Sequence, residues 1–187
     1  MARIKSAWEI ALEKTKDIEV DETKYKNDTL TREGMALAGG YLNNTDQKID
    51  EVAAKYASYS DSDRALVRGG MVSIILSNVS LPADELFRMR FERNSDLVNM
   101  ITDGDAQAGR LMNQIGDFLQ QYIDAKKAFV DRMKAQIQQA MESNPESVNS
   151  AQYSQLISQN LKKMDDQYSQ ALDNSKEDLR QLLEALA

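Results

Sequence analysis

The sequence contains no cysteine and no histidine, and each absence excludes a class of chemistry. Without cysteine there are no disulfide bonds, no cysteine-ligated zinc sites, no iron–sulfur clusters and no thiol nucleophile. Without histidine the chain lacks the commonest general base and the commonest transition-metal ligand. Any catalysis would rest on carboxylates, lysine, arginine, tyrosine and hydroxyl groups, and we expect no cofactor and no metal site.

Long apolar runs are also absent. The most apolar stretch, residues 71–76, is far too short to span a bilayer, and the charged N-terminal segment has no signal-peptide core. We therefore expect a cytoplasmic protein with no membrane partner. The 187 residues carry 23 Lys+Arg and 30 Asp+Glu, a net charge of −7, and an acidic surface also disfavours nucleic acid as a partner.

Proline and glycine are scarce, and all eight glycines lie at or before Gly116. This distribution, together with helical spacing of the apolar residues, predicts an all-α fold. We expect about five short helices in an N-terminal unit, residues 1–103, followed by a long antiparallel, coiled-coil-like helical hairpin, residues 104–187. A single continuous structure formed by both parts remains the alternative.

Capping signals place the helices of the N-terminal unit. Trp8 shares an apolar face with Ile4 and Leu12, which predicts a core anchor. The diglycine Gly39-Gly40 is expected to end the second helix. The expected helices cover residues 2–16, 21–38, 46–56, 60–77 and 81–103, with Pro82 in the first turn of the last.

A second diglycine, Gly69-Gly70, lies inside an apolar helical run. Two glycines within a helix cost about 1 kcal/mol each, so we expect a compensating interaction. Close approach of another helix is the preferred interpretation. The alternatives are a kink or a backbone contact with a ligand.

The hairpin is predicted from two long apolar stripes separated by the turn around Pro145. Small residues interrupt the stripes at Ala125, Ala171 and Ser175; we expect close packing there, with insertion of a partner helix as the alternative. The stripe positions are Leu111, Ile115, Phe118, Tyr122, Ala125, Phe129 and Met133, then Tyr153, Ile157, Leu161, Met164, Tyr168, Leu172, Ser175, Leu179, Leu182 and Leu186.

Paired carboxylates have explanations other than catalysis. Asp61 and Asp63, like Asp103 and Asp105, sit where a helix is expected to begin and where acids stabilise the helix dipole. The alternative is a magnesium-dependent hydrolase of the all-helical type, with its carboxylates drawn from Asp61, Glu85, Glu92 and Asp96.

The strongest basic cluster contains five arginines: Arg64, Arg68, Arg88, Arg90 and Arg93. Because acidic residues surround them, internal ion pairs are the preferred interpretation. A binding site for an acidic partner protein is the next interpretation, and a nucleic-acid or ribosome-associated role is a further alternative.

The opening ARIKSAWEIALEKTKDI, the Glu33-Gly34 pair and the segment 37–42 resemble a small uncharacterised family of bacterial all-helical proteins. The closing segment, from Asn160 through Tyr168 to the leucine-rich end of the chain, is similar too. The resemblance implies a cytoplasmic helical protein and brings no activity or functional residues with it.

These observations favour a non-catalytic protein: a scaffold or assembly factor that binds through helical surfaces. The expected partner is another protein or a second copy of the chain, since a long amphipathic hairpin offers a large helical surface.

Overall fold

The computed structural model describes residues 8, 21–83, 87–143 and 150–186, and within them it contains helices and no strand. The predicted all-α class is confirmed. No helix in this described part is long and apolar enough to cross a membrane. The helices are α2 (Glu22–Asn43), α3 (Ile49–Ala57), α4 (Asp61–Asn78), α5 (Phe87–Ile101), α6 (Ala106–Ser143) and α7 (Ser150–Ala185).

The helix predicted over residues 2–16 lies outside the described residues, with the exception of Trp8. The Trp8 side chain is 72% exposed, so the prediction that it anchors the core is wrong. An indole that exposed buries too little apolar surface to hold a helix in place.

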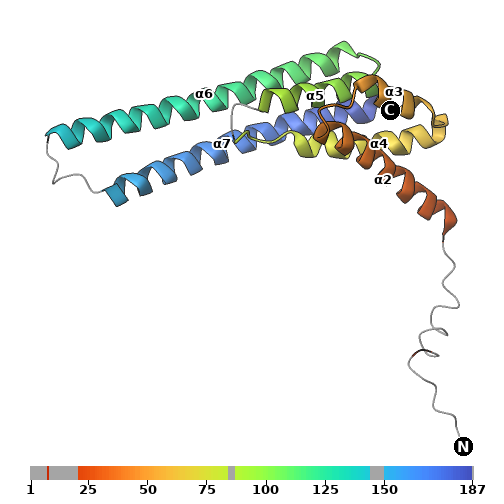
Figure 1. The fold of residues 1–187 in the computed structure, drawn as a ribbon, viewed down its shortest axis with the longest axis horizontal. Coiled ribbons are helices and arrows are strands. Elements are labelled where there is room, and N and C mark those ends of the chain that lie inside the picture. Colours follow the sequence, from red (N-terminus) through yellow and green to blue (C-terminus); the bar gives the residue numbers. More distant parts are fainter. Residues whose placement is uncertain (1–7, 9–20, 84–86, 144–149, 187) are drawn as a thin grey trace, which may run out of the picture.

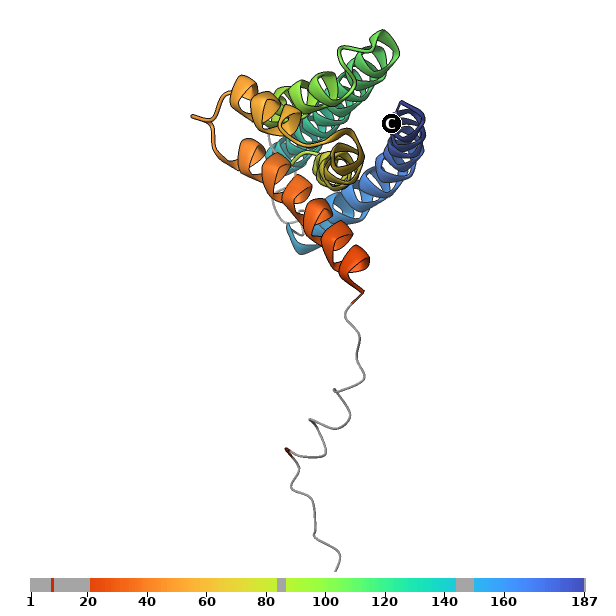
Figure 2. The same ribbon diagram turned by 90° about the vertical axis from the view of Figure 1, so that its right-hand side faces the viewer.

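Helix α4 is the centre of the molecule, with the other helices arranged around it (Figure 2). Its residues Val67, Met71 and Ile75 are fully buried. They belong to one buried cluster that also includes Leu97 of α5 and Leu179 of α7. A helix that packs on several others is apolar around much of its circumference. The exposed side of α4 carries mainly small residues such as Ala65, Gly69 and Ser73.

Helices α2 and α4 cross with their backbones in contact, and two glycines allow this approach. A Cβ atom on Gly70 would lie 2.0 Å from the carbonyl oxygen of Thr31, and one on Gly34 would lie 1.9 Å from that of Val67. The predicted close approach at Gly69-Gly70 is therefore confirmed at Gly70. Gly69 has open space at the Cβ position.

The first diglycine does not end α2, which continues through it to Asn43. The prediction from Gly39-Gly40 was wrong because tertiary interactions stabilise the additional turn. The Tyr41 side chain is 2% exposed, and its hydroxyl donates a hydrogen bond to Asp96 Oδ2 at 2.8 Å. Burial of that ring outweighs the helix-ending tendency of glycine, which is about 1 kcal/mol per residue.

The predicted acids lie at two helix starts, and Asp105 caps the second of these helices, α6. The Asp105 Oδ1 atom accepts hydrogen bonds from the backbone N–H groups of Gln107 and Ala108 at 2.8 and 2.9 Å. The preceding turn uses positive φ angles, 52° at Asp103 and 76° at Gly104. Asp61 and Asp63 lie in the first turn of α4, after the N-cap Ser60.

Helices α6 and α7 lie side by side and run in opposite directions (Figure 1). The rings of Phe118 and Tyr168 are 5.2 Å apart, and the Tyr122 hydroxyl donates to Asp165 Oδ1 at 2.7 Å. The residue numbers that meet therefore increase along α6 and decrease along α7, as in an antiparallel pair. The coiled-coil character of the pair stays a prediction.

The buried face of α6 departs from the predicted heptad. In the first part of α6, the buried residues include Met112 and Leu119. The predicted stripe positions Leu111 and Phe118 are only partly buried. Here α6 packs on α5 as well as on α7, so a single 3.5-residue stripe cannot describe its contacts. At the end of α7, Leu183 is buried and the predicted Leu186 is 38% exposed.

Candidate functional site

The five arginines of the predicted basic cluster do not form one exposed surface. Arg68 is buried, Arg64 and Arg93 are partly buried, and Arg88 and Arg90 are exposed. The first three donate hydrogen bonds to carbonyl oxygens near the C-terminal ends of helices. A helix end has carbonyls without intrahelical partners and carries partial negative charge, so a guanidinium is a favourable partner.

Arg68 of α4 binds the end of α7. Its Nη1 atom donates to the Leu186 carbonyl oxygen at 2.6 Å, and its Nη2 atom donates to that of Leu183 at 2.9 Å. The Arg68 side chain is only 8% exposed, and its Nε atom has no partner among the described residues. This contact fixes the end of α7 against the central helix.

Arg93 of α5 binds the C-terminal end of α2 in the same way. Its guanidinium donates to the carbonyl oxygens of Tyr41, Asn44 and Gln47 at 2.6 to 3.1 Å. It also lies over the Tyr41 ring, 3.8 Å from the ring centre. Stacking on an aromatic face while donating several hydrogen bonds suits the planar guanidinium and not an ammonium group.

Arg64 of α4 binds the end of α3 and the turn after it. Its Nη2 atom donates to the carbonyl oxygens of Ala57 and Tyr59 at 3.2 and 3.0 Å. One weak ion pair, 3.6 Å to the exposed Asp61, supplements these bonds. Three arginines thus act inside the molecule, and their described partners are mostly carbonyls where we had predicted ion pairs.

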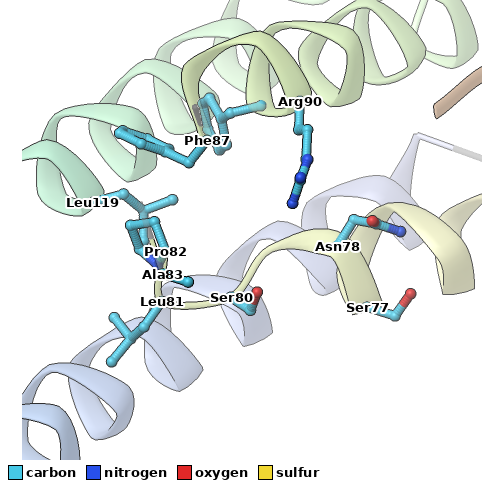
Figure 3. Close-up of a pocket in the computed structure, with 10 residues that line it drawn as sticks. Ser77, Asn78, Ser80, Leu81, Pro82, Ala83, Phe87, Arg90 and Leu119 are labelled. Carbon is cyan, nitrogen blue, oxygen red and sulfur yellow. The ribbon is translucent and has the colours of Figure 1, made fainter. Parts of the chain in front are cut away.

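Arg88 and Arg90 are the cluster's exposed members. The Arg88 Nε atom donates to Gln120 Oε1 at 2.9 Å. Arg90 has no ion pair or hydrogen bond with the described residues, and its side chain points from α5 toward the segment 77–83 (Figure 3). There it lines a pocket of about 240 Å³ with Asn78, Ser80 and an apolar wall that includes Leu119.

Sequence reasoning missed the carbonyl-binding role of the arginines, although a signal for it existed. Neither α2 nor α7 has a basic residue in its last turn. Both ends therefore lack a local cation for their free carbonyls, and a cation from another helix is the alternative. The sequence could not show which arginine reaches which end, because the pairs are 46 to 118 residues apart.

The carboxylates considered for a magnesium site take other roles in the described part. Asp96 accepts the Tyr41 hydroxyl, and Asp61 lies at the exposed start of α4. Glu85 lies outside the described residues. Among those described, no group of three or more Asp and Glu side chains is placed to hold a metal ion.

We define the head as α2 to α5 together with residues 106–119 of α6 and 172–185 of α7. The second candidate surface is the part of α6 and α7 that projects beyond the head. We define the arm as residues 120–143 and 150–171, none of which belongs to the main buried cluster. In the head, Leu172, Leu179 and Leu183 of α7 are at most 3% exposed. The arm portion of α7 over residues 151–171 continues the same apolar stripe but contains no buried residue.

A polar and aromatic contact joins the two helices at the base of the arm. Tyr122 donates to Asp165, and Lys126 Nζ donates to the Tyr122 hydroxyl oxygen at 3.0 Å. The Tyr168 ring packs against both Phe118 and Tyr122. Burial raises the pKa of Tyr122, so the phenol keeps its proton and continues to donate to Asp165.

Comparison with known proteins identifies a family without assigning an activity. A family model described as a family of unknown function (DUF6657) matches residues 53–181, which is more than half of the chain. The match includes the segment 160–168 and not the opening segment on which most of the sequence resemblance rested. No curated protein and no solved structure matches the chain.

Proposed function

We propose that the chain, which belongs to this family of unknown function, is a non-catalytic protein that binds another protein through the arm. The shape supports a scaffold or assembly role, because a pair of helices extends past a helical head packed around α4 (Figure 1).

The observation that carries the proposal is the change in burial along one helix. In the head, where α4 and α6 contact α7, the α7 stripe includes the buried Leu172 and Leu179, whereas every α7 stripe position in the arm is only partly buried. The stripe in the arm includes Tyr153, Ile157 and Leu161, which are half-buried, and Leu156 beside it is 46% exposed. A partner helix laid along this face would increase the burial of the stripe in the arm toward that of Leu172 and Leu179 in the head.

Arg88 and Arg90 supply a second element of the proposal. Their guanidinium groups remain accessible, so they can bind carboxylates of a partner that extends from the arm to α5. The other three arginines are held by carbonyl groups and contribute to the fold.

Photo-crosslinking in the native cell tests the proposal. A photoreactive phenylalanine analogue at position 156 should form a crosslink to a protein, because that side chain lies on the partly exposed arm. The same analogue at Tyr25, which is 68% exposed on the head, is the matched control and should give no such product. Equal crosslinking at both positions, or none at position 156, would contradict arm-mediated binding.

A further inference from the structure

Two stretches in the outer part of the arm carry no charge, and Glu142 lies just beyond the first of them. Residues 135–141 of α6 and 150–161 of α7 contain no Asp, Glu, Lys or Arg, in a chain in which 28% of residues are charged. Two large apolar side chains here are well exposed: Met141 at 48% and Leu156 at 46%. The other positions in these two stretches are mostly Gln, Ser, Ala and Asn.

Two of these features, the lack of charge and the exposed methionine, are typical of interface centres, whereas serine and alanine are not enriched there. Interface centres are depleted in charge and enriched in methionine and aromatic residues, while neutral amides and hydroxyls provide hydrogen bonds. A projecting helix pair exposed only to water would normally carry charged side chains on its outer faces.

The absence of charge also indicates which partner fits. A two-fold interface places a surface against itself, so a patch with net charge repels its own copy. The whole chain has a net charge of −7, which adds a general repulsion between two copies that an uncharged patch does not increase. A partner of opposite charge would be recognised through charged groups, which residues 135–141 and 150–161 lack.

The basic part of α6 limits where two copies can meet. Within residues 126–134 of α6, the cations Lys126, Lys127, Arg132 and Lys134 outnumber the single anion Asp131. Two copies in contact through this segment would repel each other. The interface must therefore lie nearer the tip on α6 and along residues 150–161 of α7.

We infer that the outer arm binds a second copy of the chain, so that two helix pairs form a four-helix contact around Met141 and Leu156. This inference rests on the proposed function and names its partner. The contact is isologous, so each side chain at its centre occurs twice. The Tyr153 and Ile157 side chains, half-buried in one copy, become buried in the pair.

Light scattering coupled to size exclusion, over a concentration series of the full chain, tests the inference. We expect twice the mass of one chain. The substitution pair Met141→Glu and Leu156→Glu should raise the dissociation constant at least about tenfold, because four carboxylates would then enter a desolvated contact. The control Met89→Glu changes a side chain that is 53% exposed on α5 and should leave the mass unchanged. Helical circular dichroism should be the same for all variants.

Salt provides an independent readout. An uncharged apolar contact should persist in about 1 M sodium chloride, where charges are screened beyond about 3 Å. A wild-type chain that stays monomeric at every concentration, a dimer that ignores the arm substitutions, or a dimer that dissociates in high salt would each overturn the inference. A monomer that still crosslinks from position 156 to a different protein would refute self-association while leaving the proposed function intact.

Discussion

The close crossing of α2 and α4 can be tested by the stability of variants at two adjacent glycines. Gly69→Ala and Gly70→Ala make the same chemical change one residue apart in the same helix. A Cβ atom at residue 69 has no atom within 4 Å, whereas one at residue 70 would lie 2.0 Å from the Thr31 carbonyl oxygen. The difference between the two variants therefore measures the backbone contact alone.

The expected magnitudes have opposite signs. Alanine is favoured over glycine by about 1 kcal/mol in a helix interior, so Gly69→Ala should stabilise the protein by about that amount. At residue 70 the new atom is about 1.4 Å too close to backbone, which cannot change rotamer as a side chain can. Overpacking costs about 1–3 kcal/mol, and we take the upper end. After the gain in helix propensity, Gly70→Ala should destabilise by about 2 kcal/mol.

Urea unfolding followed by circular dichroism at 222 nm measures both changes. The midpoint should rise for Gly69→Ala and fall for Gly70→Ala, and the thermal midpoint of the latter should drop by about 4–8 °C. Gly34→Ala, whose Cβ would lie 1.9 Å from the Val67 carbonyl oxygen, should behave like Gly70→Ala. Equal stability of the residue 69 and residue 70 variants would refute the close crossing.

Three further predictions concern single side chains. Asp105→Ala removes the N-terminal cap of α6 and should lower the free energy of unfolding by about 1 kcal/mol in urea titrations, while Asp105→Asn should retain most of it. Arg68→Met leaves the carbonyl groups at the end of α7 without their donor, so it should lower the free energy of unfolding by about 1.5–3 kcal/mol. Amide hydrogen exchange in the last turn of α7 should increase, and unchanged exchange would contradict the capping role. Burial and a carboxylate partner raise the pKa of Tyr41 and of Tyr59 to about 12, so stability should be constant below pH 10 and fall as the pH rises from 10 to 12. In the double variant Tyr41→Phe/Tyr59→Phe that alkaline fall should shrink, as measured by unfolding at stepped pH.

The helical class and most helix bounds were predictable because they depend on local signals. The cap at Ser60, the acids of the first α4 turn and the cap at Asp105 are read from a few consecutive residues, and the structure confirms them. The long α6 and α7 were predictable for the same reason, since their apolar spacing continues for many turns.

Failures of prediction occurred where distant residues decide the outcome. Gly39-Gly40 reads locally as a helix end, but Asp96 and Arg93 of α5 bind Tyr41 and so extend α2. Gly34 gave no local signal, since its role depends on Val67 crossing over it. The basic cluster presented the same difficulty. Of its five arginines, which lie within thirty residues, three bind carbonyl groups and two are exposed. Which outcome applies depends on the helix that each arginine faces.

The central position of α4 has a consequence for the order in which the protein folds. During synthesis α4 emerges more than a hundred residues before Leu179 and Leu183, the side chains of α7 that cover part of it. Until the end of α7 emerges, the guanidinium of Arg68 lacks the Leu183 and Leu186 carbonyls that it binds. An unfinished chain therefore exposes an apolar helix face of the kind that chaperones bind, and the last turns of α7 complete the burial of α4.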